Sequence, residues 1–354
     1  MTKTIRVFIL LSVALGSASV YAHHSFQATF TSDAKIDVEG VVTKFSFRNP
    51  HIIVYLDVTN ADGTVTNWMS EGAAATLMRR AGWDRNTVKP GDLIRVHGDS
   101  THDGSPMVSI DSIDVLDSET HAVVRTLSRS RGGRDEGYTE KAAAMPLTLE
   151  GGKPNLTGAW TNHGMEGGRP APPNINFNDV GAALQASYNK ANDPQIFCDP
   201  PGLVRQLNTP HPVRITQLED RVVIEYEEYA GRREIMLGSV VPDSGTKTHF
   251  GDSVARYEGD ALIIETINLR ANPTSPEGHS LSDQTTTVET YTRADTDRYG
   301  PTLSINVKIS DPVNLRDIGS ISRDKMSAGV YEFIENDCRP PMRERTALYS
   351  TTGD

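Results

Sequence analysis

The chain has 354 residues, which is enough for two domains of ordinary size. Its hydrophobic content of 37 % is compatible with folded cores, and its formal net charge at pH 7 is −11. Because nucleic acids and anionic membranes bind to basic surfaces, this charge argues against both kinds of partner.

The first 22 residues have the pattern of a secretory signal peptide. Lys3 and Arg6 form a basic start, residues 7–20 are mostly apolar, and Val20 and Ala22 occupy the small-residue positions before a cleavage site. We therefore expect cleavage after Ala22 and export to a bacterial periplasm or the exterior, with no membrane insertion after cleavage. An uncleaved anchor is the alternative.

Residues 23–118 are predicted to form an OB-like β domain. Alternating apolar residues predict strands at 38–47, 52–58, 64–70, 93–97 and 107–116, with a short helix at 73–81. Three strands, a helix and two more strands is the order of a small OB-type barrel. Such barrels often bind nucleic acid, but this segment is acidic and lacks a basic groove with interleaved aromatic residues. We therefore expect no nucleic-acid partner.

Residues 119–154 are rich in Arg, Ser and Gly without a core pattern, so they are predicted to be a linker. Residues 155–343 are predicted to form a second β domain, followed by a tail at 344–354. Its strands are expected at 213–218, 222–229, 232–237, 253–258, 261–267, 285–292, 302–309 and 329–336, with a helix at 181–191.

Many short strands separated by turns predict an antiparallel barrel or sandwich. Gly158-x-Trp160 near the first strand resembles lipocalin-like barrels, in which a tryptophan closes one end. The predicted fold class is therefore all-β with minor α: an OB-like barrel followed by a lipocalin-like domain.

Cys198 and Cys338 are the only cysteines. An even count in an oxidising compartment favours one disulfide, which would connect the start of the second domain to its end. Two separate buried thiols are the alternative.

Motifs that occur in order along the chain resemble those of two protein families. The segments AHHSF (22–26) and EGVVTKFSFRNPH (39–51) resemble a secreted bacterial domain family of unknown function, whose mature chains begin His-His-Ser. The motif C-x-P-P-G-x-x-R, from Cys198 to Arg205, is similar to a second group of uncharacterised exported proteins. That group usually has His-Ser where this chain has Asp252-Ser253. The resemblances imply an exported β protein and name no reaction.

The first candidate site is a metal site formed by His23, His24 and His51. After cleavage the α-amino group and imidazole of His23 could chelate copper, with His51 as a third nitrogen ligand. This arrangement resembles the histidine brace of exported copper proteins. The alternative is a solvated N-terminus that binds metal only adventitiously.

The second candidate site is a pocket in the C-terminal barrel. Residues of pocket-forming type there are Trp160, Arg205, His211, Tyr226, Tyr229 and His279. Each is also a common core or strand-face residue. The chain lacks the GxSxG, HExxH, GxGxxG and Walker motifs, so the sequence leaves catalysis undecided.

The leading hypothesis is an exported binding protein for copper or a small apolar ligand. The alternative is a periplasmic enzyme acting on a small organic substrate, with or without that metal. A structural or assembly factor of the cell envelope is the third hypothesis. The oligomeric state is not determined by the sequence.

Overall fold

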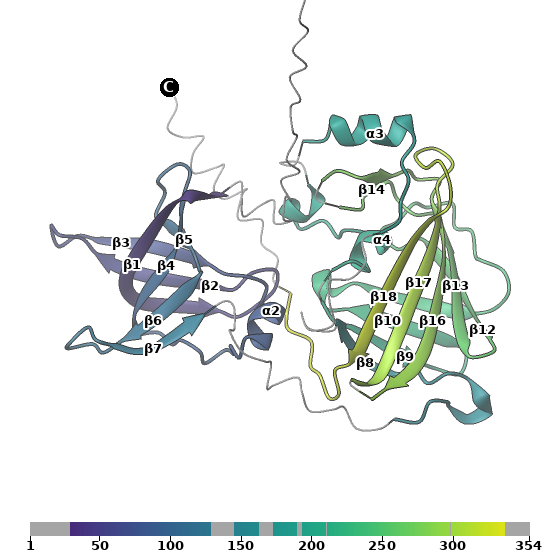
Figure 1. Ribbon diagram of the computed structural model, residues 1–354, viewed down its shortest axis with the longest axis horizontal. Coiled ribbons are helices and arrows are strands. Elements are labelled where there is room, and N and C mark those ends of the chain that lie inside the picture. The colour runs from purple at the N-terminus through teal and green to yellow at the C-terminus, as the bar shows by residue number, and fades with distance from the viewer. Residues whose placement is uncertain are drawn as a thin grey trace, which may run out of the picture.

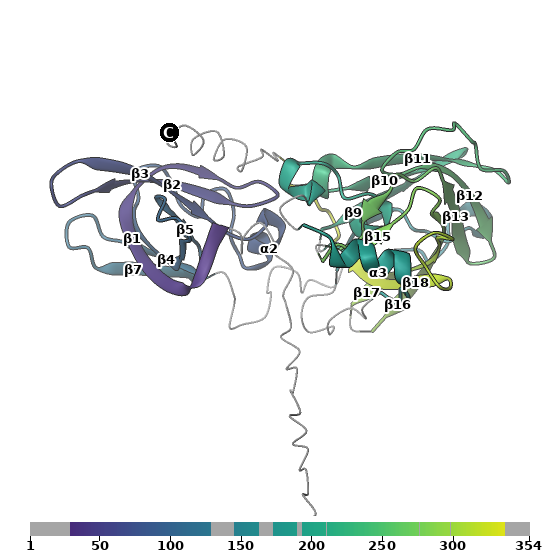
Figure 2. The same cartoon turned by 90° about the horizontal axis from the view of Figure 1, so that it is seen from above.

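The computed structural model describes residues 29–128, 145–162, 173–189, 193–209, 211–275, 277–297 and 299–336. These residues are mostly β-sheet, closed into a barrel in each half of the chain, with a few short helices. This architecture confirms the predicted fold class. The two barrels lie side by side (Figures 1 and 2). Within the described ranges, every helix is too short or too polar to cross a bilayer.

The first barrel has the strand order of an OB fold. Its elements are β1 (Phe30–Ser46), β2 (Ile53–Thr59), β3 (Val65–Glu71), α2 (Ala75–Arg80), β4 (Leu93–Thr101), β5 (Met107–Ser109), β6 (Ser112–Leu116) and β7 (Val123–Ser128). The order β1-β2-β3-β5-β4 is closed by pairing of β4 with β1. The helix α2 lies between β3 and β4 in sequence, as predicted.

Alternation along the strands explains this barrel. Val54 and Leu56 of β2, and Ile94 and Val96 of β4, are completely buried, while the residues between them are only partly buried. Successive strand residues point to opposite faces, so each strand contributes one apolar row to the interior. The long strand β1 pairs with β4 along its first part and with β2 along its last part.

The predicted linker at 119–154 is partly wrong because it contains a strand. Val123–Ser128 forms β7, which pairs with β6 at the edge of the first sheet. Val123 and Val124 are exposed, and none of the residues of β7 is fully buried. Only Leu127 of this strand packs, partly buried, against the first core, and a single such residue leaves no alternating apolar pattern in the sequence.

The second barrel contains β8 (Gly158–Asn162), β9 (Val213–Gln217), β10 (Arg221–Tyr226), β11 (Arg232–Leu237), β12 (Asp252–Glu258), β13 (Ala261–Ile267), β16 (Thr286–Thr296), β17 (Gly300–Ser310) and β18 (Gly319–Ser327). It is not purely antiparallel, because β11 and β12 are parallel. The connection at 238–251 returns the chain along the barrel instead of forming a hairpin.

Short elements surround one end of this barrel. They are α3 (Asp179–Ala186), α4 (Leu203–Gln206) and the two-stranded ribbon of β14 (Asn272–Pro273) and β15 (Ser280–Leu281). Three 3-10 turns, at Glu150–Gly152, Pro194–Phe197 and Glu228–Ala230, complete the described elements. Figure 1 shows α4 and β14 together at this end.

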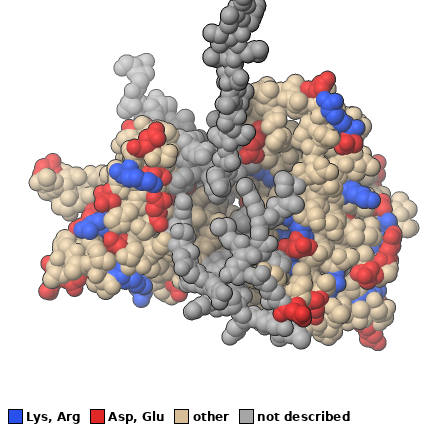
Figure 3. Space-filling view, viewed as in Figure 1, with Lys and Arg blue, Asp and Glu red and all other residues tan. Residues whose placement is uncertain are grey.

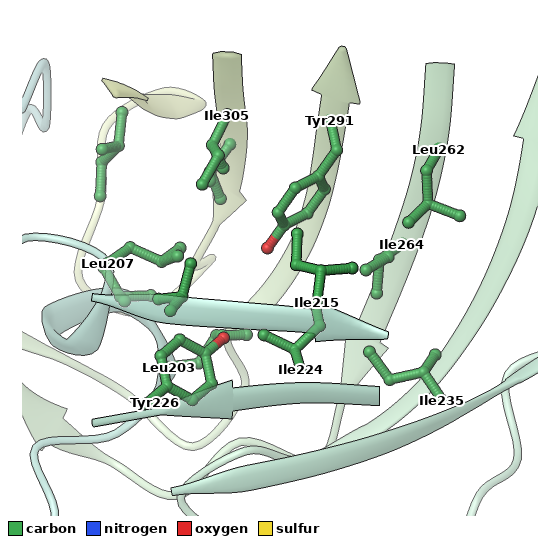
Figure 4. Packing of buried hydrophobic residues seen from close by; sticks show 14 of the residues in the cluster. Leu203, Leu207, Ile215, Ile224, Tyr226, Ile235, Leu262, Ile264, Tyr291 and Ile305 are labelled. Atoms are coloured by element: carbon green, nitrogen blue, oxygen red, sulfur yellow. The ribbon is translucent and has the colours of Figure 1, made fainter. Parts of the chain in front are cut away.

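Large side chains fill the interior of the second barrel. Figure 4 shows residues from opposite strands meeting those of α4, among them Leu203, Ile224 and Tyr291. Trp160 is fully buried, donates from Nε1 to the Leu156 carbonyl oxygen at 2.8 Å, and lies under the Arg293 guanidinium. Because the described interior is packed with side chains, space for a ligand has to be sought at the end of the barrel.

The last predicted strand, 329–336, is wrong. The barrel ends with β18, whose inward-facing Arg323 and Lys325 hide the apolar alternation. Residues 328–336, which we call the strap, lead instead to the first barrel. Ile334 is buried in the core of the first barrel, and the Asn49 N–H donates to the Glu335 carbonyl oxygen at 3.1 Å.

Candidate functional site

A shallow hollow lies at the end of the second barrel, beside α4 and the β14–β15 ribbon, and its empty space of about 290 Å³ includes open solvent. Leu203, Leu269 and Leu281 form its apolar wall together with Pro201. These three leucines are almost fully buried, so the wall is a continuation of the barrel core.

The loop before α4 is brought against the ribbon by a glycine. Gly202 has a φ of +77°, a conformation that residues with a Cβ rarely adopt. A Cβ at this position would lie 2.7 Å from the Asn272 side-chain nitrogen. The next residue, Leu203, donates its N–H to the His249 carbonyl oxygen at 2.9 Å. The glycine of the C-x-P-P-G-x-x-R motif thus allows the close approach that shapes one side of the hollow.

One edge of the hollow is charged. His249 and Arg270 both line it, and both contact the carboxylate of Asp199. His249 Nε2 lies 2.8 Å from Oδ1 of Asp199, and Arg270 donates from Nη2 to Oδ2 at 2.5 Å. Sequence reasoning missed these three residues, although Asp199 belongs to the motif that begins at Cys198. The other two lie on separate loops with no recognisable pattern.

Arg205, a predicted ligand-binding residue, also lines the hollow but is committed to the fold. Its guanidinium is buried and donates from Nη1 to both oxygens of Asp193, at 2.9 and 3.1 Å. Nη2 donates to the Gln195 side-chain oxygen. Arg205 therefore anchors the 3-10 turn behind α4.

A second polar cluster lies at the junction of the two barrels, centred on Glu227. One carboxylate oxygen accepts hydrogen bonds from Thr76 and Asn49 of the first barrel. The other accepts from the Tyr331 hydroxyl at 2.7 Å and the Ile334 N–H at 2.9 Å, both in the strap. Burial alone would raise the pKa of Glu227, but the bonds from His211, Thr76 and the strap outweigh burial and hold that pKa below its usual value.

His211 is the predicted ligand residue in this cluster. Its Nδ1 lies 3.2 Å from the Thr76 hydroxyl oxygen, and its Nε2 lies 3.7 Å from a carboxylate oxygen of Glu228. A hydroxyl, an imidazole and a carboxylate are the components of a nucleophilic triad. However, Thr76 is fully buried, and its hydroxyl donates a hydrogen bond to Glu227. The cluster therefore joins the barrels and offers no exposed nucleophile.

The remaining predicted ligand residues are dispersed. Trp160 and Tyr226 lie in the interior of the second barrel, where Tyr226 stacks on Phe250 at 5.5 Å. Tyr229 donates its hydroxyl to the Gln195 carbonyl oxygen at 3.2 Å. His279 stacks on Phe177 at 5.2 Å beside the ribbon. The structure thus does not bring these six predicted residues into one pocket.

The predicted copper ligands His23 and His24 lie outside the described residues. His51 is half-buried, with Nδ1 at 2.9 Å from the Gly72 carbonyl oxygen and 3.6 Å from a Glu71 carboxylate oxygen. Among the described residues, no group of three or more His, Cys, Asp or Glu is placed to hold a metal ion.

The register of β1 shows which end of this strand lies near His51, the third predicted copper ligand. Its first residue pairs with Thr101, whereas its last residue pairs with Ile53, just after His51. The described chain therefore begins at the opposite end of β1 from His51. The His102 N–H, by contrast, donates to the Thr29 carbonyl oxygen at 3.1 Å, so His102 is held beside that beginning.

Cys198 follows the 3-10 turn Pro194–Phe197 and has a φ of 59°. Cys338 lies outside the described residues, so the disulfide between them stays a prediction.

Residues 10–108 match the model of a family of unknown function (DUF6152). The match reaches β5 and agrees with the expected N-terminal domain of unknown function. It leaves the second barrel, the hollow and the strap outside. A search of curated proteins finds no match for the chain.

Proposed function

We propose that this protein binds a small organic molecule in the hollow beside α4. The observation that carries the proposal is the composition of the hollow, which is lined by leucines and prolines together with His249, Arg270 and Asn272. Ligand sites typically combine an apolar wall with a few polar groups that fix orientation.

The size of the hollow limits the ligand. The empty space of the hollow, about 290 Å³, includes open solvent, so the hollow buries only part of a ligand and leaves the rest exposed at its rim. The favoured ligand therefore places a small apolar group against the leucines and keeps its polar part near His249 and Arg270.

Fluorescence titration with N-phenyl-1-naphthylamine, a neutral apolar probe, tests the proposal. We expect saturable 1:1 binding to the native protein. Leu281→Trp fills the hollow and should lower the affinity for the probe by about tenfold or more, equivalent to about 1.4 kcal/mol of binding free energy. Val240→Trp, at an exposed loop position, is the matched control and should leave binding unchanged.

Circular dichroism melting verifies that both variants fold. If Leu281→Trp does not fold, Leu281→Ala provides the second test, because an altered wall should still change the affinity. Binding that is absent, or insensitive to every change in the wall, contradicts the proposal.

Export and the disulfide form part of the same proposal. Intact-mass analysis of protein recovered from the periplasm should show a chain that starts at His23 and is two hydrogens lighter than its reduced form. A start at another residue, or a mass unchanged by reduction, contradicts the respective part.

From the sequence we also propose Cu(II) binding by the mature N-terminus, through the amine and imidazole of His23. The position of His102 beside Thr29 supports His102 over His51 as a further ligand. A chain with one extra residue before His23 should lose tight, stoichiometric Cu(II) binding in calorimetry. Equal binding by both chains contradicts the proposal.

A further inference from the structure

The geometry points to an organic acid as the ligand of the hollow, with Asp199 occupying the position of the ligand's anionic group until the ligand displaces it. This inference rests on the proposed function and adds the chemical class of the ligand. It also assigns Asp199, His249 and Arg270 as the residues that determine specificity.

The first argument is the geometry at the edge of the hollow. His249 and Arg270 line the hollow and converge on one carboxylate, that of Asp199, through separate oxygens at 2.8 and 2.5 Å. An imidazole N–H and a guanidinium are both hydrogen-bond donors. Together they suit a carboxylate or a sulfonate as the acceptor. An acid entering the hollow would meet the same two donors.

The second argument is that the Asp199 contact is open to exchange. The side chains of Asp199, His249 and Arg270 retain 37, 24 and 40 % of their exposure. Ion pairs exposed to this extent contribute little to stability, because water competes for both partners. Another carboxylate can therefore replace Asp199 without loss of the fold.

The neighbouring ion pair shows the contrast. Arg205 of α4 and its partner Asp193 are almost fully buried, with 6 and 3 % exposure of their side chains. Breaking that pair would leave a buried charge without a partner. Asp193 and Asp199, which lie near each other in the chain, thus form one ion pair that is buried in the fold and one that is open to solvent.

When the ligand displaces Asp199, one negative charge replaces another beside His249 and Arg270. When the anionic group of the ligand binds His249 and Arg270, the Asp199 carboxylate turns into water, where its charge is solvated. The apolar body of the ligand lies on Leu269, Leu281 and Pro201, which form the wall. No covalent bond is made or broken.

Two probes with the same aromatic body test the inference. N-phenyl-1-naphthylamine is neutral, and 8-anilinonaphthalene-1-sulfonate carries an added sulfonate. Asp199→Asn removes the competing charge and should raise the affinity for the sulfonate probe by about tenfold. The affinity for the neutral probe should change little. Arg270→Ala should weaken the sulfonate probe by about tenfold and spare the neutral one.

Asp179→Asn and Arg316→Ala are matched controls, because they break an exposed ion pair between α3 and the segment that joins β17 to β18, and neither residue lines the hollow. Neither should change the affinity of either probe. If both probes bind but Asp199→Asn leaves the sulfonate affinity unchanged or weaker, the displacement mechanism is overturned and the binding function stands. If neither probe binds the native protein, the proposed function itself fails.

Discussion

Arg233 is the clearest case of a residue whose role depends on its surroundings. It lies inside the second barrel and pairs with Glu289 through both guanidinium Nη atoms, at 2.8 and 3.1 Å. Tyr291 donates its hydroxyl to Glu289 at 2.7 Å, and Arg233 also donates to Ser253 and Thr266. Although burial alone would lower the pKa of Arg233, Glu289 raises it above its ordinary value, so the Arg233 guanidinium stays charged.

Glu289→Gln should therefore destabilise the second barrel by about 3–5 kcal/mol, because it leaves the Arg233 charge buried and unpaired. Urea unfolding followed by tryptophan fluorescence measures the effect. The double variant Arg233→Met with Glu289→Leu removes both charges and should recover most of the loss. Glu258→Gln, at an exposed pair, should cost less than about 1 kcal/mol. Equal losses of unfolding free energy in Glu289→Gln and Glu258→Gln would contradict the proposed role of the buried ion pair.

At the scale of elements, His97 connects three strands on the outside of the first barrel. Its Nδ1 lies 2.7 Å from Asp37 on β1, and its Nε2 lies 3.0 Å from Asp114 on β6. Burial alone would lower the pKa of His97, but the bonds to Asp114 and Asp37 outweigh burial and raise it above 6.5. On the face shown in Figure 3, acidic and basic side chains are interspersed over both barrels.

The raised pKa sets the sign of the pH dependence. The stabilisation by His97 is fully present below the unfolded pKa of 6.5 and is lost as pH rises through the higher folded pKa. His97→Gln should therefore lower the urea midpoint at about pH 5.5 and have little effect at about pH 9. Asp114→Asn should show the same pH trend. A loss of stability that is independent of pH would show that His97 acts only by packing.

At the scale of the whole molecule, the strap and Glu227 hold the two barrels together. Ile334 fills a position in the first core, and Arg79 of α2 lies 5.2 Å from the Tyr331 ring. Glu227, from the second barrel, accepts hydrogen bonds from the strap and from the first barrel at once. The first barrel is thus completed by residues more than 200 positions later in the chain.

Ile334→Ala should destabilise the first barrel by about 2–5 kcal/mol, because it opens a cavity in a closed core. Val330→Ala, in the same strap but fully exposed, should change stability by less than about 0.5 kcal/mol. Hydrogen exchange in β1 and β2 measures both effects. Equal protection in the two variants would show that the first barrel does not need the strap.

The sequence determined the two β domains, the order of strands in the first, and most strand positions in the second. Alternation is a property of neighbouring residues, so Val54 and Leu56, or Ile94 and Val96, identify an inward row without knowledge of any partner. The pattern failed at β7, where only Leu127 packs against the core, and at β18, where Arg323 and Lys325 point inward.

Only the tertiary structure decided which polar residues meet. Asp199, His249 and Arg270 come from separate loops, and Thr76, Glu227 and Tyr331 come from both barrels and the strap. The predicted ligand residues were therefore divided between a packed interior, the junction and the edge of the hollow. Contacts between loops depend on the order and closure of the strands that carry them, which no local pattern in the chain encodes.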